Sequence, residues 1–150
     1  MIKGILFDLD GVLIDTTQLQ IDSTVEALSP YVKVNNYIKL IIKQTITTNE
    51  KLKIFSEANY LKKNQLKNIF LEKKKIFERK IKKRKIFSKK IYDIFVYLKK
   101  NNYKCALVTN ANSKTTLFIL KKMKISKFFS VIVTNKNKIK PKPSPEPYIY

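Results

Sequence analysis

One short segment near the N-terminus constrains the fold of this sequence more than any other feature. Residues 2–7 form a mostly apolar run that ends abruptly at Asp8, and Gly11 follows shortly afterwards. A short apolar run that stops at a turn signal predicts a strand buried within a parallel sheet. We therefore expect residues 2–7 to form such a strand, with acidic side chains at its carboxyl end.

Two further apolar runs predict more strands of the same sheet. One strand is predicted over residues 103–109, around Cys105-Ala-Leu-Val, and another over 128–133. Helical periodicity covers 88–101 and 113–124. The side chains expected to face inward are Ile91, Ile94, Phe95 and Leu98 in the first helix and Leu117, Leu120 and Met123 in the second. The order strand, helix, strand implies a right-handed crossover in a parallel sheet.

The middle of the chain has a different pattern, because it contains no glycine and no convincing strand. Helices are predicted over residues 17–28, 37–44, 49–58 and 64–84, with Asn49 as a plausible N-cap of the third. We therefore predict an α/β core formed by residues 1–15 and 88–150. An all-helical segment of residues 16–87 is inserted into it.

Composition excludes several other classes of protein. A single cysteine, Cys105, excludes an internal disulfide, and the absence of histidine makes a zinc site equally unexpected. No stretch approaches the roughly 20 apolar residues that cross a bilayer, so no membrane association is expected. Asp8 and Asp10 interrupt the N-terminal apolar run before it reaches the length of a signal sequence. A cytoplasmic location is the resulting expectation.

The formal net charge of +21 is the most extreme number of the composition. A basic surface attracts nucleic acid, acidic membranes or phosphorylated metabolites. The lysines are nevertheless spread over most of the sequence, on the polar faces of helical patterns, which favours a compositional origin. The densest basic run, residues 79–90, keeps nucleic-acid binding as an alternative that is not favoured.

The residues that could carry chemistry follow the predicted strands. Asp8, Thr109 and the loop after Val133 all lie at carboxyl strand ends, where open α/β sheets bind their ligands. Asp8 and Asp10 are separated by one residue, so an extended backbone directs both carboxylates the same way. Like charges this close raise one pKa unless a cation intervenes, and Mg²⁺ prefers such hard oxygen ligands.

The segment Phe7-Asp-Leu-Asp-Gly-Val-Leu-Ile-Asp15 resembles the first motif of the haloacid dehalogenase-like hydrolases, in the phosphatase and β-phosphoglucomutase-like branch. The resemblance implies that Asp8 is the nucleophile that forms an aspartyl-phosphate, and that Asp10 is the general acid and base. It also implies Mg²⁺ held by the Asp8 carboxylate and the Asp10 main-chain carbonyl, with Gly11 beside the bound phosphate.

Two later segments match further motifs of that family. Leu107-Val-Thr-Asn110 resembles the second motif, which implies that Thr109 is a catalytic phosphoryl ligand and that Asn110 binds phosphate beside it. Lys140-Pro-Lys-Pro-Ser-Pro-Glu146 resembles the third motif, and Lys142 aligns with the family lysine that offsets charge on the transferring group. Pro141 stands where the family usually has glycine.

The fourth motif of the family, one or two acidic residues after a further strand, has no counterpart here. After Asp93 the only acidic residue is Glu146, which lies in the third-motif loop. The resemblance thus implies a Rossmann-like parallel-sheet core that is incomplete at the C-terminus, with residues 16–87 as an inserted helical cap. A cap of this kind excludes water and selects the substrate.

The sequence therefore predicts a Mg²⁺-dependent phosphate-ester hydrolase that acts on a small phosphorylated metabolite. A sugar phosphomutase of the same branch is one alternative, since it differs only in where the aspartyl-phosphate is passed. The other is an inactive, truncated relative that serves as a basic nucleic-acid-binding or scaffold protein.

Overall fold

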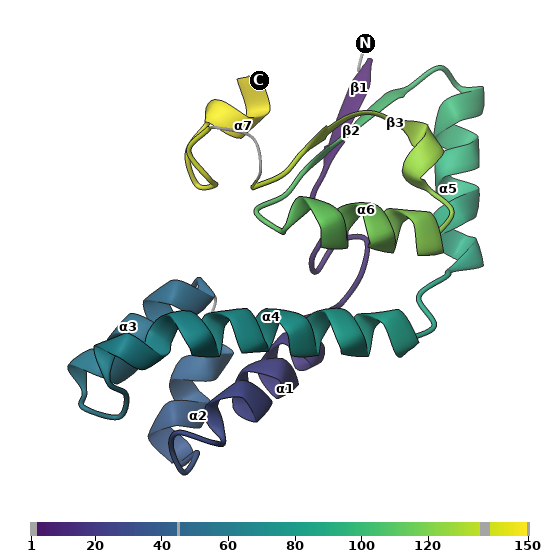
Figure 1. Ribbon diagram of the computed structural model, residues 1–150. Coiled ribbons are helices and arrows are strands. Elements are labelled where there is room, and N and C mark those ends of the chain that lie inside the picture. The colour runs from purple at the N-terminus through teal and green to yellow at the C-terminus, as the bar shows by residue number, and fades with distance from the viewer. Residues whose placement is uncertain (1–2, 45, 136–138, 150) are drawn as a thin grey trace. The chain divides into compact units, whose positions relative to one another are not determined.

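The computed structural model describes residues 3–44, 46–135 and 139–149 of the chain (Figure 1). Its residues form two compact units. One combines the N-terminal segment through Thr16 with the segment from Lys85 onward, and the other is Thr17–Arg84. Each unit is described by itself below.

The first unit contains a parallel sheet of three strands in the order β1-β2-β3. The strands are β1 (Gly4–Phe7), β2 (Lys104–Val108) and β3 (Phe129–Val133). β1 pairs with β2 from Gly4↔Lys104 to Phe7↔Leu107, and β2 pairs with β3 through Val108↔Val133. The predicted α/β class with a parallel sheet is confirmed.

Four short or medium helices accompany this sheet: α5 (Lys89–Lys100), α6 (Ser113–Lys122), the 3-10 turn η2 (Ser126–Phe128) and α7 (Glu146–Ile149). Ser88 caps α5, and the Asn112 side chain accepts hydrogen bonds at the start of α6. Phe7, Phe95 and Phe129 form an aromatic cluster with ring centroids 5.0–6.1 Å apart. These rings anchor α5 to the sheet.

Burial in this unit differs from the sequence prediction at four positions. Leu6 of β1 is 55% exposed and Val131 of β3 is 47% exposed, so the segment predicted as a buried strand is only partly covered. The reason is that β1 and β3 are the two edges of the described sheet, so each has neighbouring strand side chains on one side only, whereas the central β2 is more buried. Ile94 and Leu117, expected to face inward, are also exposed. The buried apolar side chains of these helices are Phe95 and Leu98 in α5 and Ile119 and Leu120 in α6.

In the second unit, the regular elements formed by the described residues are all helices. It comprises α1 (Thr17–Leu28), α2 (Asn36–Lys43), α3 (Thr48–Glu57), the 3-10 turn η1 (Lys63–Gln65) and α4 (Leu66–Lys83). Its apolar core is formed by Ala27, Leu28, Ile38, Ile41, Ile42, Leu52, Phe55, Leu61, Ile69 and Ile76. This core lies entirely within one contiguous segment of sequence.

The start of α3 corrects one prediction. Asn49 is not the N-cap, because it lies inside the first turn of the helix. Thr47 caps the helix through its side chain, and Oε2 of Glu50 accepts a hydrogen bond from the Thr47 backbone N–H at 2.7 Å. This reciprocal pair is a capping box, and its Thr-x-x-Glu spacing outweighs the good capping propensity of asparagine.

Among the helices formed by the described residues, none is both long and apolar enough to cross a membrane.

Candidate active site

Asp8 directly follows β1 and is the first acidic group at this end of the sheet. Its side chain is 40% exposed, whereas the neighbouring Leu9 is fully buried. Oδ1 accepts a hydrogen bond from the Leu9 N–H at 2.7 Å, and Oδ2 lies 2.9 Å from Nζ of Lys142. The carboxylate is therefore oriented by contacts on both oxygens and is still open to solvent.

Asp10 lies in a tight turn that requires glycine at the next position. Gly11 has a φ of +77° and donates its N–H to the Ile14 carbonyl at 2.8 Å. A side chain is strained at such a φ, although a Cβ would meet no atom within 4 Å. Gly11 thus shapes the turn through its backbone, and its predicted contact with phosphate stays a prediction.

Thr16 is a contact of Asp10 that the sequence prediction missed. It is 1% exposed, and its Oγ1 donates a short hydrogen bond to Oδ1 of Asp10. The hydroxyl fixes the carboxylate from inside the fold. The residue type gave no signal, because a threonine just before a predicted helix is usually regarded as a capping residue.

Thr109 immediately follows β2, which is the strand next to β1. Phe7 and Leu107 are register partners, so Asp8 lies level with Val108 and Thr109 lies one residue further along at the same sheet edge. The Thr109 hydroxyl is buried with the residue at 5% exposure and accepts the Ala111 N–H at 3.1 Å. It retains a proton that it could donate to a phosphoryl oxygen.

Lys142 brings the third predicted motif to the same place. Its side chain is 18% exposed, and Nζ donates to the Val108 carbonyl at 3.1 Å in addition to pairing with Asp8. Asn110 contacts the backbone of Lys142 at two points, with Nδ2 donating to the carbonyl at 3.0 Å and Oδ1 accepting the N–H at 2.9 Å. Lys142 therefore contacts both Asp8 and Asn110 directly.

The oxygen atoms of Asp8 and Asp10 suit a hard divalent cation that takes few ligands from the protein. Asp8 and Asp10 offer only oxygen atoms, and both residues are accessible. Mg²⁺ is typically held by one or two carboxylates together with water and substrate phosphate, which fits this set. No group of three or more potential metal-binding side chains occurs among the residues that the structure describes.

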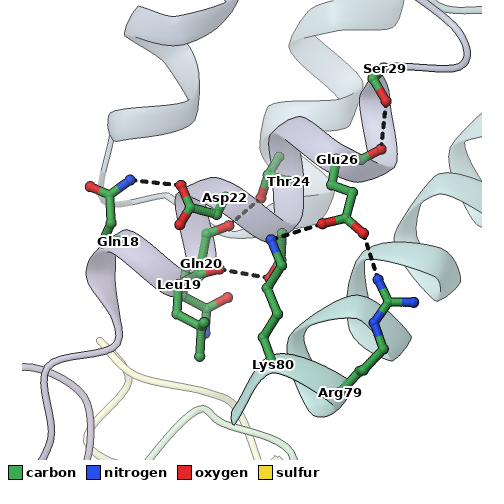
Figure 2. A network of polar contacts seen from close by, with 10 residues as sticks. Gln18, Leu19, Gln20, Asp22, Thr24, Glu26, Ser29, Arg79 and Lys80 are labelled. Carbon is green, nitrogen blue, oxygen red and sulfur yellow. Dashed lines mark hydrogen bonds and ion pairs between the residues drawn. The ribbon is translucent and has the colours of Figure 1, made fainter. Parts of the chain in front are cut away.

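Two residues of the densest basic run, residues 79–90, form ion pairs within the helical unit. In the helical unit, Glu26 of α1 bridges two residues of α4, with 2.5 Å to Nη2 of Arg79 and 2.8 Å to Nζ of Lys80 (Figure 2). The hydrogen bond from Lys80, reinforced by both positive charges, lowers the pKa of Glu26. In the same unit, Lys51 donates a hydrogen bond to the Ile42 carbonyl at 2.5 Å, and burial lowers the pKa of Lys51.

Comparison with known proteins identifies the family of this chain. The model of the haloacid dehalogenase-like hydrolase family matches residues 5–150. The chain therefore belongs to the haloacid dehalogenase-like hydrolase family.

Individual relatives are distant and longer. The chain is 30% identical over 133 residues to the pyrophosphatase PpaX of Bacillus thuringiensis strain Al Hakam, covering 89% of this chain and 59% of the relative. It is 27% identical over 133 residues to the PpaX of Bacillus cereus strain B4264, with the same coverage. The chain thus spans 59% of the length of these curated relatives.

Solved structures share the fold at low sequence identity. A predicted phosphoglycolate phosphatase from Haemophilus somnus superposes with a TM-score of 0.80 at 20% identity, covering 99% of this chain and 69% of that one. A β-phosphoglucomutase from Clostridium difficile gives a TM-score of 0.74 at 24% identity, with 99% and 69% covered. CbbY from Rhodobacter sphaeroides, solved with xylulose-(1,5)bisphosphate, gives a TM-score of 0.74 at 21% identity. The match covers 99% of this chain and 70% of that one.

Proposed function

We propose that this chain carries the nucleophile and phosphate-binding part of a phosphate-ester hydrolase that acts on a small phosphorylated metabolite. The single observation that carries the proposal is the contact of the Lys142 ammonium with the Asp8 carboxylate, 2.9 Å apart at the end of β1. A cation beside an oriented, solvent-accessible carboxylate suits attack on an anionic phosphoryl group. Family membership and the pyrophosphatase relatives support the same class of substrate.

The first chemical step is a displacement at phosphorus by Asp8. A carboxylate oxygen forms a bond to phosphorus while the bond to the leaving alcohol breaks, which gives an aspartyl-phosphate. Asp10 donates a proton to the departing oxygen, so the alcohol leaves neutral. Thr16 supports this role, because its buried hydroxyl holds one oxygen of Asp10 in place.

The second step reverses these roles. Asp10 accepts a proton from water as the water oxygen attacks phosphorus, and the bond between phosphorus and Asp8 breaks to release inorganic phosphate. Lys142 offsets negative charge on the phosphoryl oxygens in both steps, and the Thr109 hydroxyl donates to one of them. If a sugar hydroxyl replaced water in this step, the same residues would perform a phosphomutase reaction.

Asp8 and Asp10 are the residues that would hold Mg²⁺. The bound ion would neutralise part of the charge on the phosphoryl group. We further propose that residues 16–87 act as a cap that selects the substrate, as in the branch that the sequence resembles.

The test is turnover of a panel of phosphate esters and pyrophosphate by the purified chain, with Mg²⁺ and with a chelator. We expect Asp8→Asn to lower turnover by about 10³-fold or more, because the amide cannot act as the nucleophile. Asp93→Asn is the matched control, since Asp93 is an exposed carboxylate on α5. If Asp8→Asn retains the turnover of the unmodified chain, the proposed mechanism is wrong.

A further inference from the structure

We propose that Asn110 is a positioning residue, which holds the backbone of Lys142 so that its ammonium stays at Asp8. This inference rests on the proposed function, in which Lys142 serves as the phosphoryl cation. It assigns Asn110 a role different from the phosphate contact that the sequence pattern suggests. The residue acts through another residue and need not touch the substrate.

The geometry of the Asn110 amide carries the argument. Both ends of its side chain bind the two polar backbone groups of one residue, at 3.0 Å from Nδ2 to the Lys142 carbonyl and 2.9 Å from the Lys142 nitrogen to Oδ1. A side-chain amide that binds both the N–H and the carbonyl of one residue closes a ring of two hydrogen bonds, which fixes both distance and orientation. The Oδ1 atom and one of the two Nδ2 hydrogens are therefore engaged with Lys142.

The position of Asn110 explains why its two hydrogen bonds to the Lys142 backbone are useful. Asn110 leaves β2 two residues after Val108, whose carbonyl accepts the Lys142 ammonium at 3.1 Å. The end of β2 therefore contacts Lys142 twice, once at its backbone and once at the tip of its side chain. A lysine side chain has large rotamer entropy. Fixing its backbone therefore reduces the conformational entropy that is lost when the ammonium contacts Asp8.

Other hydrogen bonds among the described residues 139–149 lie within this loop. Ser144 donates its N–H to the Pro141 carbonyl at 3.0 Å, and the Lys140 N–H binds Glu146 at 2.9 Å. These bonds shape the loop but do not connect it to the sheet. Asn110 provides a neutral connection to the sheet that does not depend on the charge state of Asp8.

The test measures the accessibility of Lys142 in the full chain, without any need for activity. Acylation with an amine-reactive acetate ester, followed by mass spectrometry, gives the labelling rate of Lys142 relative to the exposed Lys140. We expect Asn110→Ala to raise this ratio by about tenfold, the factor that two modest hydrogen bonds support. Asn110→Asp should also raise it, because a carboxylate cannot donate to the Lys142 carbonyl.

Asn112→Ala is the matched control, because Asn112 is the same residue type two positions away and caps α6. It should lower the melting temperature and leave the labelling ratio unchanged. An unchanged ratio in both Asn110 variants overturns the proposal. An equal rise in Asn112→Ala also overturns it, since the effect would then be general loosening.

Turnover separates this inference from the proposed function. In Asn110→Ala we expect kcat to fall while KM changes little, as for a misplaced group that acts in the transition state. If the unmodified chain hydrolyses no phosphate ester, the proposed function fails, whereas the labelling ratio still decides whether Asn110 positions Lys142. If labelling rises and kcat stays unchanged, the positioning role in catalysis is refuted.

Discussion

Replacing Lys142 with methionine removes the ammonium beside Asp8 and keeps a flexible side chain in its place. The N–O distance of 2.9 Å corresponds to a gross attraction of about 6 kcal/mol at an effective dielectric constant of about 20. Most of this is offset by desolvation and side-chain ordering, and Asp8 remains 40% exposed to water. The net loss of folding stability should therefore be about 1 kcal/mol or less.

The effect on chemistry should be much larger than the effect on stability. A donor aimed at the charge of a transition state contributes about 10²–10³-fold to turnover. We therefore expect Lys142→Met to lower phosphate-ester turnover by about that factor, while the melting temperature falls by only about 2–4 °C.

The assay pairs turnover with thermal unfolding followed by circular dichroism. Lys140→Met is the matched control on the same loop, because its side chain is 80% exposed and lies 3.7 Å from Glu146. It should change neither quantity appreciably. The reasoning is refuted if Lys142→Met turns over substrate at the unmodified rate, or if both lysine variants lose the same activity.

Two further predictions concern the helical unit. Phe55→Ala removes a fully buried ring and should cost about 3–5 kcal/mol in a urea titration, whereas Leu40→Ala, at 63% exposure, should cost little; equal costs would contradict the assigned core. The pKa of Glu26 is lowered chiefly by its hydrogen bond from Lys80, so its contribution to stability is full above the ordinary value of 4.5. That contribution is lost as the pH falls through the lowered pKa of the folded state. As the pH is lowered from neutral to below 4.5, the melting temperature should therefore fall less steeply in Glu26→Gln than in the unmodified chain. Parallel curves of melting temperature against pH would exclude this role of Glu26.

Much of the fold could be predicted because local patterns and global packing agree. Apolar runs placed the strands, and 3.6-residue periodicity placed the long helix α4. Burial was harder, since it depends on which neighbours cover a strand. Leu6 has the residue type of a buried position, yet β1 has only one neighbouring strand in the described sheet.

The candidate site shows a similar division. The motifs located Asp8 and Lys142, and the structure brings these two side chains together. The contact of Thr16 with the Asp10 side chain could not be predicted from the pattern, because it depends on the turn between them. The two hydrogen bonds of Asn110 could not be predicted either, because they depend on a loop that returns to a strand end distant in sequence. Hydrogen bonds between side chains and loops have no sequence period, so periodicity does not predict them.

The interruption of the α/β unit by a contiguous helical segment has a consequence for the order of folding. Residues 17–84 can form their own core within one continuous segment, without closure of the longer loop between β1 and β2, which favours earlier folding. Pairing of β1 with β2 joins Gly4 to Lys104, and closing a flexible loop of that length costs about 4 kcal/mol of chain entropy. Prior collapse of the helices shortens the effective loop and reduces this barrier. We therefore expect the parallel sheet, and with it the Asp8 site, to assemble after the helical segment.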